Sequence, residues 1–325
     1  MKSKDIKIYD SVLEYICLEL SHPLGNIKEK YKENIEEIRL RTGMPLNIYL
    51  QGTNYFLTPD GRLSKNKGEG LIVKSEHIHK TFQLISNYSV YAFEEEIKNG
   101  FITLKGGHRV GLGGKVLYGN NGIETIRNIS SLNIRIAREK IGVSDDIIQY
   151  LIDNSNFIYN TLIISPPQCG KTTLLRDIIR TLSDGASIFN GKGFKVGVVD
   201  ERSELSGMYN GEPQHNIGLR TDVLDGCNKK DGTTMLIRAM SPDIIAMDEI
   251  GSVSDVEAIH ESLKAGVRVI ATVHGNDLKD LMSKRSLSIL IEERVFGRYI
   301  FLDNSRGVGT VRDILDGKYF KSMKK

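Results

Sequence analysis

The stretch SPPQCGKTT, residues 165–173, decides the fold of the second half of the chain. Before it, the apolar run Leu162–Ile164 predicts a buried strand, and after it the run from Thr173 to Ile178 predicts a helix. A Gly-Lys-Thr loop between a strand and a helix presents backbone N–H groups and the positive end of the helix dipole to an anion. We therefore predict a phosphate-binding loop for ATP. Its nucleotide-binding residues are Ser165, Pro166, Pro167, Gln168, Cys169, Gly170, Lys171, Thr172 and Thr173.

Within this loop, Lys171 is expected to contact the β- and γ-phosphates and Thr172 to bind Mg²⁺. The first glycine of the usual G-x-x-x-x-G-K-[ST] pattern is replaced by Ser165, so the strand must end where a side chain is tolerated. The surrounding strand and helix still favour a nucleotide loop over a chance Gly-Lys-Thr in a turn.

A second apolar run, Asp243 to Met247, ends in two acids, Asp248 and Glu249. In open α/β sheets, ligands bind beyond the carboxyl ends of the strands. We expect Asp248 to hold Mg²⁺ through water and Glu249 to polarise the attacking water, which makes the chain an ATP hydrolase. The alternative is a solvated acidic pair without a catalytic role.

Two further strand ends carry candidate catalytic residues. Thr272 and His274 follow an apolar run, and either side chain could sense the γ-phosphate, although a lone histidine is as often structural. Glu201 follows Asp200 at another strand end, where it could position water or metal. The alternative for Glu201 is an ion pair with Arg202.

The base of the nucleotide is not read directly by any motif. Residues 228–231, NKKD, formally match the guanine-reading N-K-x-D pattern, and residues 248–251, DEIG, match D-x-x-G. Their order is reversed relative to GTPases, and we expect no strand before Asn228, so ATP is favoured over GTP.

The chain divides into two expected domains. Residues 1–140 mix helical and β-type runs, which predicts a smaller α+β domain for partner or oligomer contacts, and residues 141–325 alternate strand and helix, which predicts an α/β P-loop ATPase domain with a parallel sheet. The strands expected in the second domain are Leu162–Ser165, Lys195–Asp200, Ile244–Asp248, Val267–Thr272 and Tyr299–Leu302, with an edge run at Gly309–Ile314.

Two patterns in the first domain receive structural interpretations. Apolar residues from Ile6 to Leu20 recur at three- and four-residue spacing, which predicts one face of a helix that packs on the domain; docking to a membrane partner is the alternative. The glycines between Gly106 and Gly114 have β-type runs on both sides, so they predict hairpin turns and bulges rather than a nucleotide loop.

Composition limits the class of protein. The 325 residues include 44 Lys and Arg against 41 Asp and Glu, so the net charge of +3 gives little reason to expect nucleic-acid binding. Cys17, Cys169 and Cys227 are too far apart for a metal motif, and their odd number fits a reducing cytoplasm. No stretch approaches the roughly 20 apolar residues that span a bilayer, so membrane attachment would come through a partner.

The second half resembles the secretion ATPase superfamily, the hexameric motors of type II and type IV secretion and pilus systems. Residues 237–243 (IRAMSPD), the acids that follow, and residues 272–277 (TVHGND) are similar to the Walker B and histidine boxes of that superfamily. Many relatives have glycine where this chain has Asp248, so the site is closer to an ordinary ATPase there.

A narrower resemblance covers nearly the whole chain. Residues 165–171 (SPPQCGK), 199–204 (VDERSE), 220–227 (RTDVLDGC), 38–41 (IRLR) and 107–111 (GHRVG) resemble the stage III sporulation AA family. In that family a serine at the position of Ser165 looks usual. The resemblance implies a cytoplasmic ATPase, peripheral at the mother-cell side of the forespore membrane, that works with channel subunits such as stage III sporulation protein AB.

An arginine from a neighbouring subunit can accelerate phosphoryl transfer by about 10³ to 10⁵, and we therefore hypothesise a homohexamer. The candidate arginines are Arg127, Arg135, Arg138, Arg220 and Arg238. One alternative is a RecA-like ATPase that binds nucleic acid, for which the chain offers only a short basic tail from Lys318 to Lys325. Another is a scaffold with a structural nucleotide.

Overall fold

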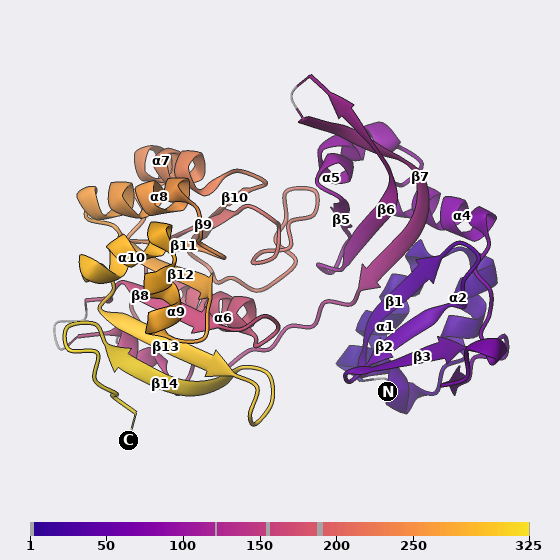
Figure 1. The fold of residues 1–325 in the computed structure, drawn as a ribbon, viewed down its shortest axis with the longest axis horizontal. Helices are drawn as coiled ribbons and strands as arrows, with labels where there is room; N and C mark the ends of the chain where they lie inside the picture. Colours follow the sequence, from indigo (N-terminus) through magenta and orange to yellow (C-terminus); the bar gives the residue numbers. More distant parts are fainter. Residues whose placement is uncertain (1–2, 121, 154–156, 187–190, 325) are drawn as a thin grey trace. The chain divides into compact units, whose positions relative to one another are not determined.

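The computed structural model describes residues 3–120, 122–153, 157–186 and 191–324. The chain forms two compact units (Figure 1). The N-terminal unit contains the residues up to Arg138 together with Gly207–Gln214, and the C-terminal unit contains Glu139–Ser206 and the residues from His215 onward. The segment Gly207–Gln214 belongs to the N-terminal unit although it lies within the second half of the sequence, which no sequence pattern indicated.

The N-terminal unit is built on a 7-stranded sheet with the order β4-β3-β2-β1-β7-β6-β5. Neighbouring strands are antiparallel. The strands are β1 (Ile35–Arg41), β2 (Asn47–Leu50), β3 (Thr53–Leu57), β4 (Leu63–Ser64), β5 (Phe101–Thr103), β6 (Arg109–Gly119) and β7 (Gly122–Arg135). The helices are α1 (Lys4–Val12), α2 (Leu18–Gly25), α3 (Glu29–Lys32), α4 (Ser75–Ile85) and α5 (Glu94–Lys98), with short 3₁₀ turns at Leu13–Tyr15, Lys67–Glu69 and Val90–Phe93. The predicted α+β class is confirmed.

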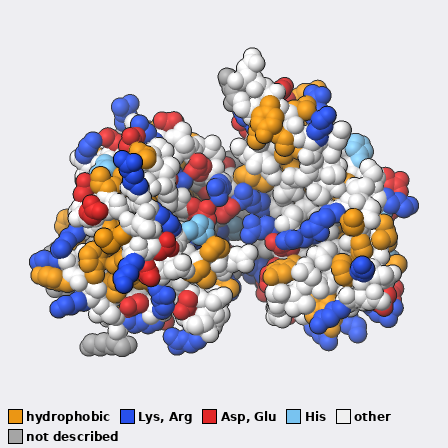
Figure 2. Space-filling model, in the orientation of Figure 1, with side chains coloured by type: hydrophobic (Ala, Val, Ile, Leu, Met, Phe, Trp, Pro, Cys, Tyr) orange, Lys and Arg blue, Asp and Glu red, His pale blue; other side chains and the backbone are white. Residues whose placement is uncertain are grey.

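The two faces of this sheet differ in character. Ile38 of β1, Ile134 of β7 and Val110 of β6 are aligned across the strands and buried in one core. The alternate positions carry charge, and Glu37, Arg135 and Arg109 are aligned in the same way. Because side chains alternate between faces along a strand, the basic residues lie on the face opposite the core. Figure 2 shows basic side chains as a band across this unit.

The single N-terminal helix expected over Ile6–Leu20 is wrong in one respect. Helix α1 ends at Val12, a 3₁₀ turn follows, and Ile16 is extended before α2 begins at Leu18. The backbone N–H of Cys17 donates to the Thr81 hydroxyl at 3.2 Å, a tertiary contact that replaces a helical hydrogen bond. The residues of the predicted apolar face nevertheless pack on the core, so the packing interpretation is confirmed. Leu13 is partly buried, and the others are buried: Ile6, Tyr9, Val12, Ile16, Cys17 and Leu20. The glycine-rich stretch also forms the predicted hairpins, with a register shift at Gly113/Lys115.

The C-terminal unit contains a second 7-stranded sheet with the order β10-β9-β11-β12-β8-β13-β14. All neighbouring pairs are parallel except β13 and β14. The strands are β8 (Thr161–Ser165), β9 (Val196–Asp200), β10 (Thr221–Asp225), β11 (Ile244–Met247), β12 (Arg268–His274), β13 (Arg298–Asp303) and β14 (Thr310–Asp316). The helices are α6 (Lys171–Asp184), α7 (Lys229–Met240), α8 (Val253–Lys264), α9 (Leu278–Ser283) and α10 (Arg285–Glu292), with a 3₁₀ turn at Ile148–Leu151.

Helices cover both faces of this parallel sheet (Figure 1). Ile163 packs in the core that includes Leu174 and Ile178 of α6, whereas Leu162 and Ile164 pack in the core that includes Leu287 of α10. A strand buried on both faces reads as a continuous apolar run, which is why its sequence identified it. The predicted α/β class with a parallel sheet is confirmed, as is the strand at the sheet edge, β14.

Strand β10 was not expected. Its sequence, TDVLD, alternates polar and apolar residues, and its burial pattern is partial because it lies at the edge of the sheet. The expectation that no strand precedes Asn228 is therefore wrong.

The buried carboxylate of Asp177 joins α6 to the segment that begins this unit. Its oxygens accept hydrogen bonds from the N–H of Gly142 at 3.1 Å and from the N–H and hydroxyl of Ser144 at 2.8 Å each. Arg180 also pairs with it at 2.8 Å. Burial acts to raise the pKa of Asp177, but the hydrogen bonds from Ser144, Arg180 and Gly142 together outweigh it, and the pKa is lowered. The charged form therefore stabilises the fold.

Replacing Asp177 with asparagine should lower the free energy of unfolding by about 2 kcal/mol at pH 7, because buried N–H groups lose their acceptor. Since the folded pKa is depressed, the contribution of the carboxylate is present above the unfolded pKa and is lost as pH falls through the folded pKa. The difference in the free energy of unfolding between wild type and variant should therefore become smaller at acidic pH. Urea unfolding at several pH values measures it, with the exposed Asp146→Asn as control. An effect equal to that of the control would contradict the assignment.

Candidate functional site

The loop between β8 and α6 has the backbone geometry of an anion site. Gln168 and Gly170 have φ of +62° and +84°, in the left-handed region. Gly170 caps the N-terminus of α6 without a side-chain acceptor, so the first N–H groups of the helix are left for an anion. Lys171 is the first residue of α6, so the helix begins two residues before the run from Thr173 that predicted it.

Ser165 ends β8 with its side chain buried, and its hydroxyl donates to the carbonyl of Pro166 at 2.9 Å. Its own carbonyl accepts the N–H of Gly275 at 3.1 Å, which joins the end of β8 to the end of β12. The serine thus fits the strand exit that the motif usually gives to glycine, and it leaves the loop geometry intact.

Asp248 follows β11 and lies beside the loop. One carboxylate oxygen accepts the Thr172 hydroxyl at 2.6 Å, and the other accepts the Thr272 hydroxyl and, at 3.1 Å, the N–H of Glu249. Strand order explains the contact, because β12 separates β11 from β8 and contributes Thr272 between them. The structure therefore brings together the two residues predicted to hold Mg²⁺.

Glu249 is the centre of a charged cluster. Its Oε1 lies 2.7 Å from Nζ of Lys171 and 2.9 Å from Nε2 of His274, and Nζ of Lys171 lies 3.2 Å from the same imidazole nitrogen. Its Oε2 accepts NH1 of Arg202 at 2.9 Å. The ends of β9, β11 and β12 and the start of α6 supply these side chains, so residues from four parts of the sequence meet at one edge of the sheet.

The proton arrangement in this cluster has two forms. Nε2 of His274 cannot accept from Lys171 and donate to Glu249 at once, since a neutral imidazole nitrogen is either donor or acceptor. Nδ1 is buried and has no hydrogen-bond partner within the described part of the chain. Neither tautomer of His274 is therefore fixed by a hydrogen bond at Nδ1.

Electrostatics keeps Glu249 charged. Burial acts to raise the pKa of the Glu249 carboxyl, but the hydrogen bond and charge of Lys171, followed by His274 and Arg202, lower it below its usual value. Its backbone φ is +52°, a strained value for a residue with a side chain, and its N–H donates to the Thr272 hydroxyl at 2.8 Å. This conformation points the carboxylate at Lys171.

The oxygen ligands present fit a magnesium ion better than a metal held by the protein alone. Mg²⁺ commonly takes one or two protein oxygens and completes its octahedron with water and phosphate. The Thr172 hydroxyl and the Asp248 carboxylate form such a pair. Among the described residues, no group of three or more His, Cys, Asp and Glu side chains could hold a metal.

Glu201 lies outside this cluster. It pairs with Lys229 of α7, whose Nζ also lies 3.9 Å from Asp255. The predicted alternative, an ion pair with Arg202, is wrong, because Arg202 turns instead to Glu249. The sequence placed Arg202 at the correct strand end but gave it the wrong partner, since the ends of β9 and β11 become neighbours only in the folded sheet.

The N-K-x-D match at residues 228–231 has a structural role. Asn228 caps α7: its side-chain oxygen accepts the N–H of Asp231 at 2.9 Å, and its amide donates to the Asp231 carboxylate at 2.7 Å. Because Lys229 is bound to Glu201, the polar groups of the motif already have partners. Although β10 does precede this segment, its contacts give no support to guanine recognition.

The candidate arginines differ in the number of hydrogen bonds and ion pairs that they make within their own units. Arg138 donates to the carbonyls of Ile35 and Lys32 at 2.6 and 3.0 Å, and burial lowers its pKa. Arg220 donates to the Ser183 carbonyl at 2.8 Å, at the end of α6. Arg135 lies 3.7 Å from Glu37, and Arg127 and Arg238 are exposed. Their action in a neighbouring subunit stays a prediction.

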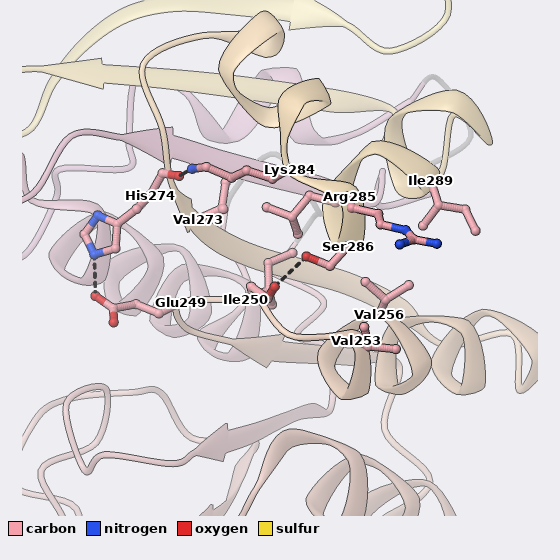
Figure 3. A pocket seen from close by; sticks show the side chains of 12 residues that line it. Glu249, Ile250, Val253, Val256, Val273, His274, Lys284, Arg285, Ser286 and Ile289 are labelled. Carbon is pink, nitrogen blue, oxygen red and sulfur yellow. Dashed lines mark hydrogen bonds and ion pairs between the residues drawn. The ribbon is translucent and has the colours of Figure 1, made fainter.

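A pocket of 780 Å³ adjoins the cluster on the side of α8 and α10 (Figure 3). Glu249 and His274 stand at one end, and Val253, Val256 and Ile289 contribute apolar surface. Lys284 closes one wall by donating to the His274 carbonyl at 2.6 Å (Figure 3). Because Lys171 and Thr172 do not line this pocket, it is a neighbour of the phosphate site and not the site itself.

Comparisons with solved structures agree with this fold. The chain superposes on the ATPase DotB from Yersinia pseudotuberculosis with a TM-score of 0.55 and 15% identity, over 98% of this chain and 80% of that one. It superposes on the pilus retraction motor PilT with bound ADP with a TM-score of 0.51 and 14% identity, over 82% and 74% of the two chains. At these identities the likeness concerns the fold alone.

Sequence comparisons are more specific. The chain is 44% identical over 307 residues, 94% of this chain and 95% of the relative, to stage III sporulation protein AA of Bacillus subtilis (strain 168). It is 32% identical over 176 residues, 52% of this chain and 24% of the relative, to the protein SEEDLING PLASTID DEVELOPMENT 1 of Arabidopsis thaliana. The family described as "Sporulation stage III, protein AA" matches residues 7–321. The chain therefore belongs to this sporulation family.

Proposed function

We propose that the chain is a Mg²⁺-dependent ATPase. The observation that carries the proposal is the meeting of Lys171 and Glu249, 2.7 Å apart, beside a phosphate loop with the Thr172–Asp248 pair next to it. A passive nucleotide binder needs the loop and the lysine. A hydrolase also needs a side chain that orients the attacking water, and we assign this role to Glu249.

The contacts suggest how the residues act when ATP binds. Lys171 leaves Glu249 for the β- and γ-phosphates, and the N–H groups at the start of α6 bind phosphate oxygens. Glu249, still charged, is then free to hold the attacking water, while Arg202, His274 and Thr272 lie close enough to respond to the γ-phosphate. Bound Mg²⁺, held by Thr172 and by Asp248 through water, would neutralise phosphate charge. Glu201, which follows β9 and pairs with Lys229, would position a further water.

We infer that this ATPase works as a homohexamer in endospore formation, peripheral at the mother-cell side of the forespore membrane and near the channel complex. Family membership supports the sporulation role, and the fold shared with PilT and DotB supports a motor. None of the described helices is long and apolar enough to cross a membrane. Attachment through membrane subunits such as stage III sporulation protein AB is part of the proposal.

Replacing Glu249 with glutamine should reduce the rate of Mg²⁺-ATP turnover by roughly 10² or more, because the amide cannot act as a base toward water. Phosphate release from the purified full chain measures it. Glu257→Gln is the matched control, since Glu257 is exposed on α8 and pairs with Lys230. Equal turnover by wild type and the Glu249 variant would show that the measured activity is not that of this site.

The Glu249→Gln variant should also bind ATP more tightly than the wild type, with a severalfold lower Kd, although its turnover is slower. In the wild type the carboxylate holds Lys171, and the nucleotide must compete for that lysine. Calorimetry with a non-hydrolysable ATP analogue and Mg²⁺ measures the affinity, and Lys171→Ala should abolish binding. Weaker binding by the Glu249 variant would contradict the competition.

Oligomerisation should depend on nucleotide if a neighbouring arginine completes the site. Sedimentation of the full chain with Mg²⁺ and the ATP analogue should show a hexamer, and Arg127→Ala should lower turnover without lowering ATP affinity. A monomer at cellular concentrations under these conditions would contradict the ring.

A further inference from the structure

The turn between β13 and β14, residues Asn304 to Gly309, lies against the phosphate loop. The N–H of Gly309 donates to the carbonyl of Cys169 at 3.0 Å. A Cβ atom placed on Gly170 would lie 3.0 Å from Cγ1 of Val308 and 3.2 Å from Cα of Gly309. Gly170 is therefore required both by its positive φ and by the close approach of this turn. We call residues 304–309 the β13–β14 turn (Figure 1).

Local hydrogen bonds shape this turn. Oδ1 of Asp303 accepts the N–H and the hydroxyl of Ser305 at 3.1 and 2.8 Å. The N–H of Gly307 donates to the Asn304 carbonyl at 3.1 Å, and the Thr310 hydroxyl donates to the Gly307 carbonyl at 2.7 Å. A turn held in this way can present side chains to a ligand at low entropic cost.

Strand order fixes which end of a nucleotide would face the turn. The residues suited to the γ-phosphate and Mg²⁺, among them Glu249, Asp248 and His274, follow β11 and β12, on one side of β8. The β13–β14 turn flanks β8 on the other side, at the same edge of the sheet, because β13 runs parallel to β8. A triphosphate bound along the loop with its γ-phosphate at Glu249 would therefore direct its ribose and base toward this turn.

The turn offers suitable chemistry there. Val308 is 59% exposed although it borders the loop, and Arg306 is also exposed. A guanidinium stacks on the flat face of a base, and an isopropyl group covers apolar ring or sugar surface. We propose that the β13–β14 turn is the nucleoside-recognition segment of the site, with Arg306 stacking on the base and Val308 contacting base and ribose. This inference rests on the proposed ATPase function and extends it to residues outside the phosphate motif.

Inorganic tripolyphosphate separates this role from phosphate binding, because it carries the phosphates of ATP without the nucleoside. The test measures, for the full chain with Mg²⁺, the Kd of a non-hydrolysable ATP analogue and the Kd of tripolyphosphate. The double variant Arg306→Ala/Val308→Ala should bind the ATP analogue about tenfold more weakly, as expected for the loss of base stacking, and should bind tripolyphosphate as the wild type does.

The control is Lys318→Ala, which removes an exposed cation beyond the far end of β14 and should change neither Kd. Thermal unfolding without ligand verifies that the double variant is folded. Unchanged affinity for the ATP analogue, or an equal loss for both ligands, would overturn the nucleoside assignment while leaving the ATPase proposal standing. Failure of the wild type to bind either ligand would overturn both.

Discussion

The site depends on the ion pair between Lys171 and Glu249, in which the ammonium nitrogen lies 2.7 Å from a carboxylate oxygen. Lys171 starts α6, Glu249 follows β11, and the two strands β8 and β11 are separated by β12. This ion pair forms because the three strands run parallel and end at the same edge of the sheet. The geometry of the site therefore depends on the order and direction of the strands. Thr272, from the intervening strand, binds both the Asp248 carboxylate and the Glu249 N–H and holds the pair in place.

Glu249 is the shared partner of the charged side chains in the cluster. Lys171 is bound by a carboxylate that stays charged, and the left-handed backbone at Glu249 directs that carboxylate inward. In the mechanism that we propose, a nucleotide replaces this ion pair when it binds. The same exchange would release Glu249 toward water, so that one side chain would couple nucleotide binding to preparation for hydrolysis. Arg202 and His274, both in contact with Glu249, would respond to this exchange.

Local sequence patterns predicted the elements that carry the site, but not all of the contacts between them. The doubly buried strand at Leu162–Ile164 and the Gly-Lys-Thr sequence predicted the loop between β8 and α6. The acids after β11 predicted the edge of the sheet at which Asp248 and Glu249 lie. The edge strand β10 was missed because its alternating residues resemble a polar loop. The partner of Arg202 was assigned wrongly, since adjacency between β9 and β11 is a property of the sheet order. The contact of the β13–β14 turn with Gly170 joins residues far apart in sequence, and no spacing rule could supply it.

We propose that ATP takes the ammonium of Lys171 from Glu249 when it binds. A structure of the full chain with Mg²⁺ and a non-hydrolysable ATP analogue would decide this. We expect Nζ of Lys171 to contact the β- and γ-phosphate oxygens, Thr172 to ligate the metal, and Glu249 to face a water near the γ-phosphate. An intact Lys171–Glu249 pair, with the nucleotide bound elsewhere, would contradict it.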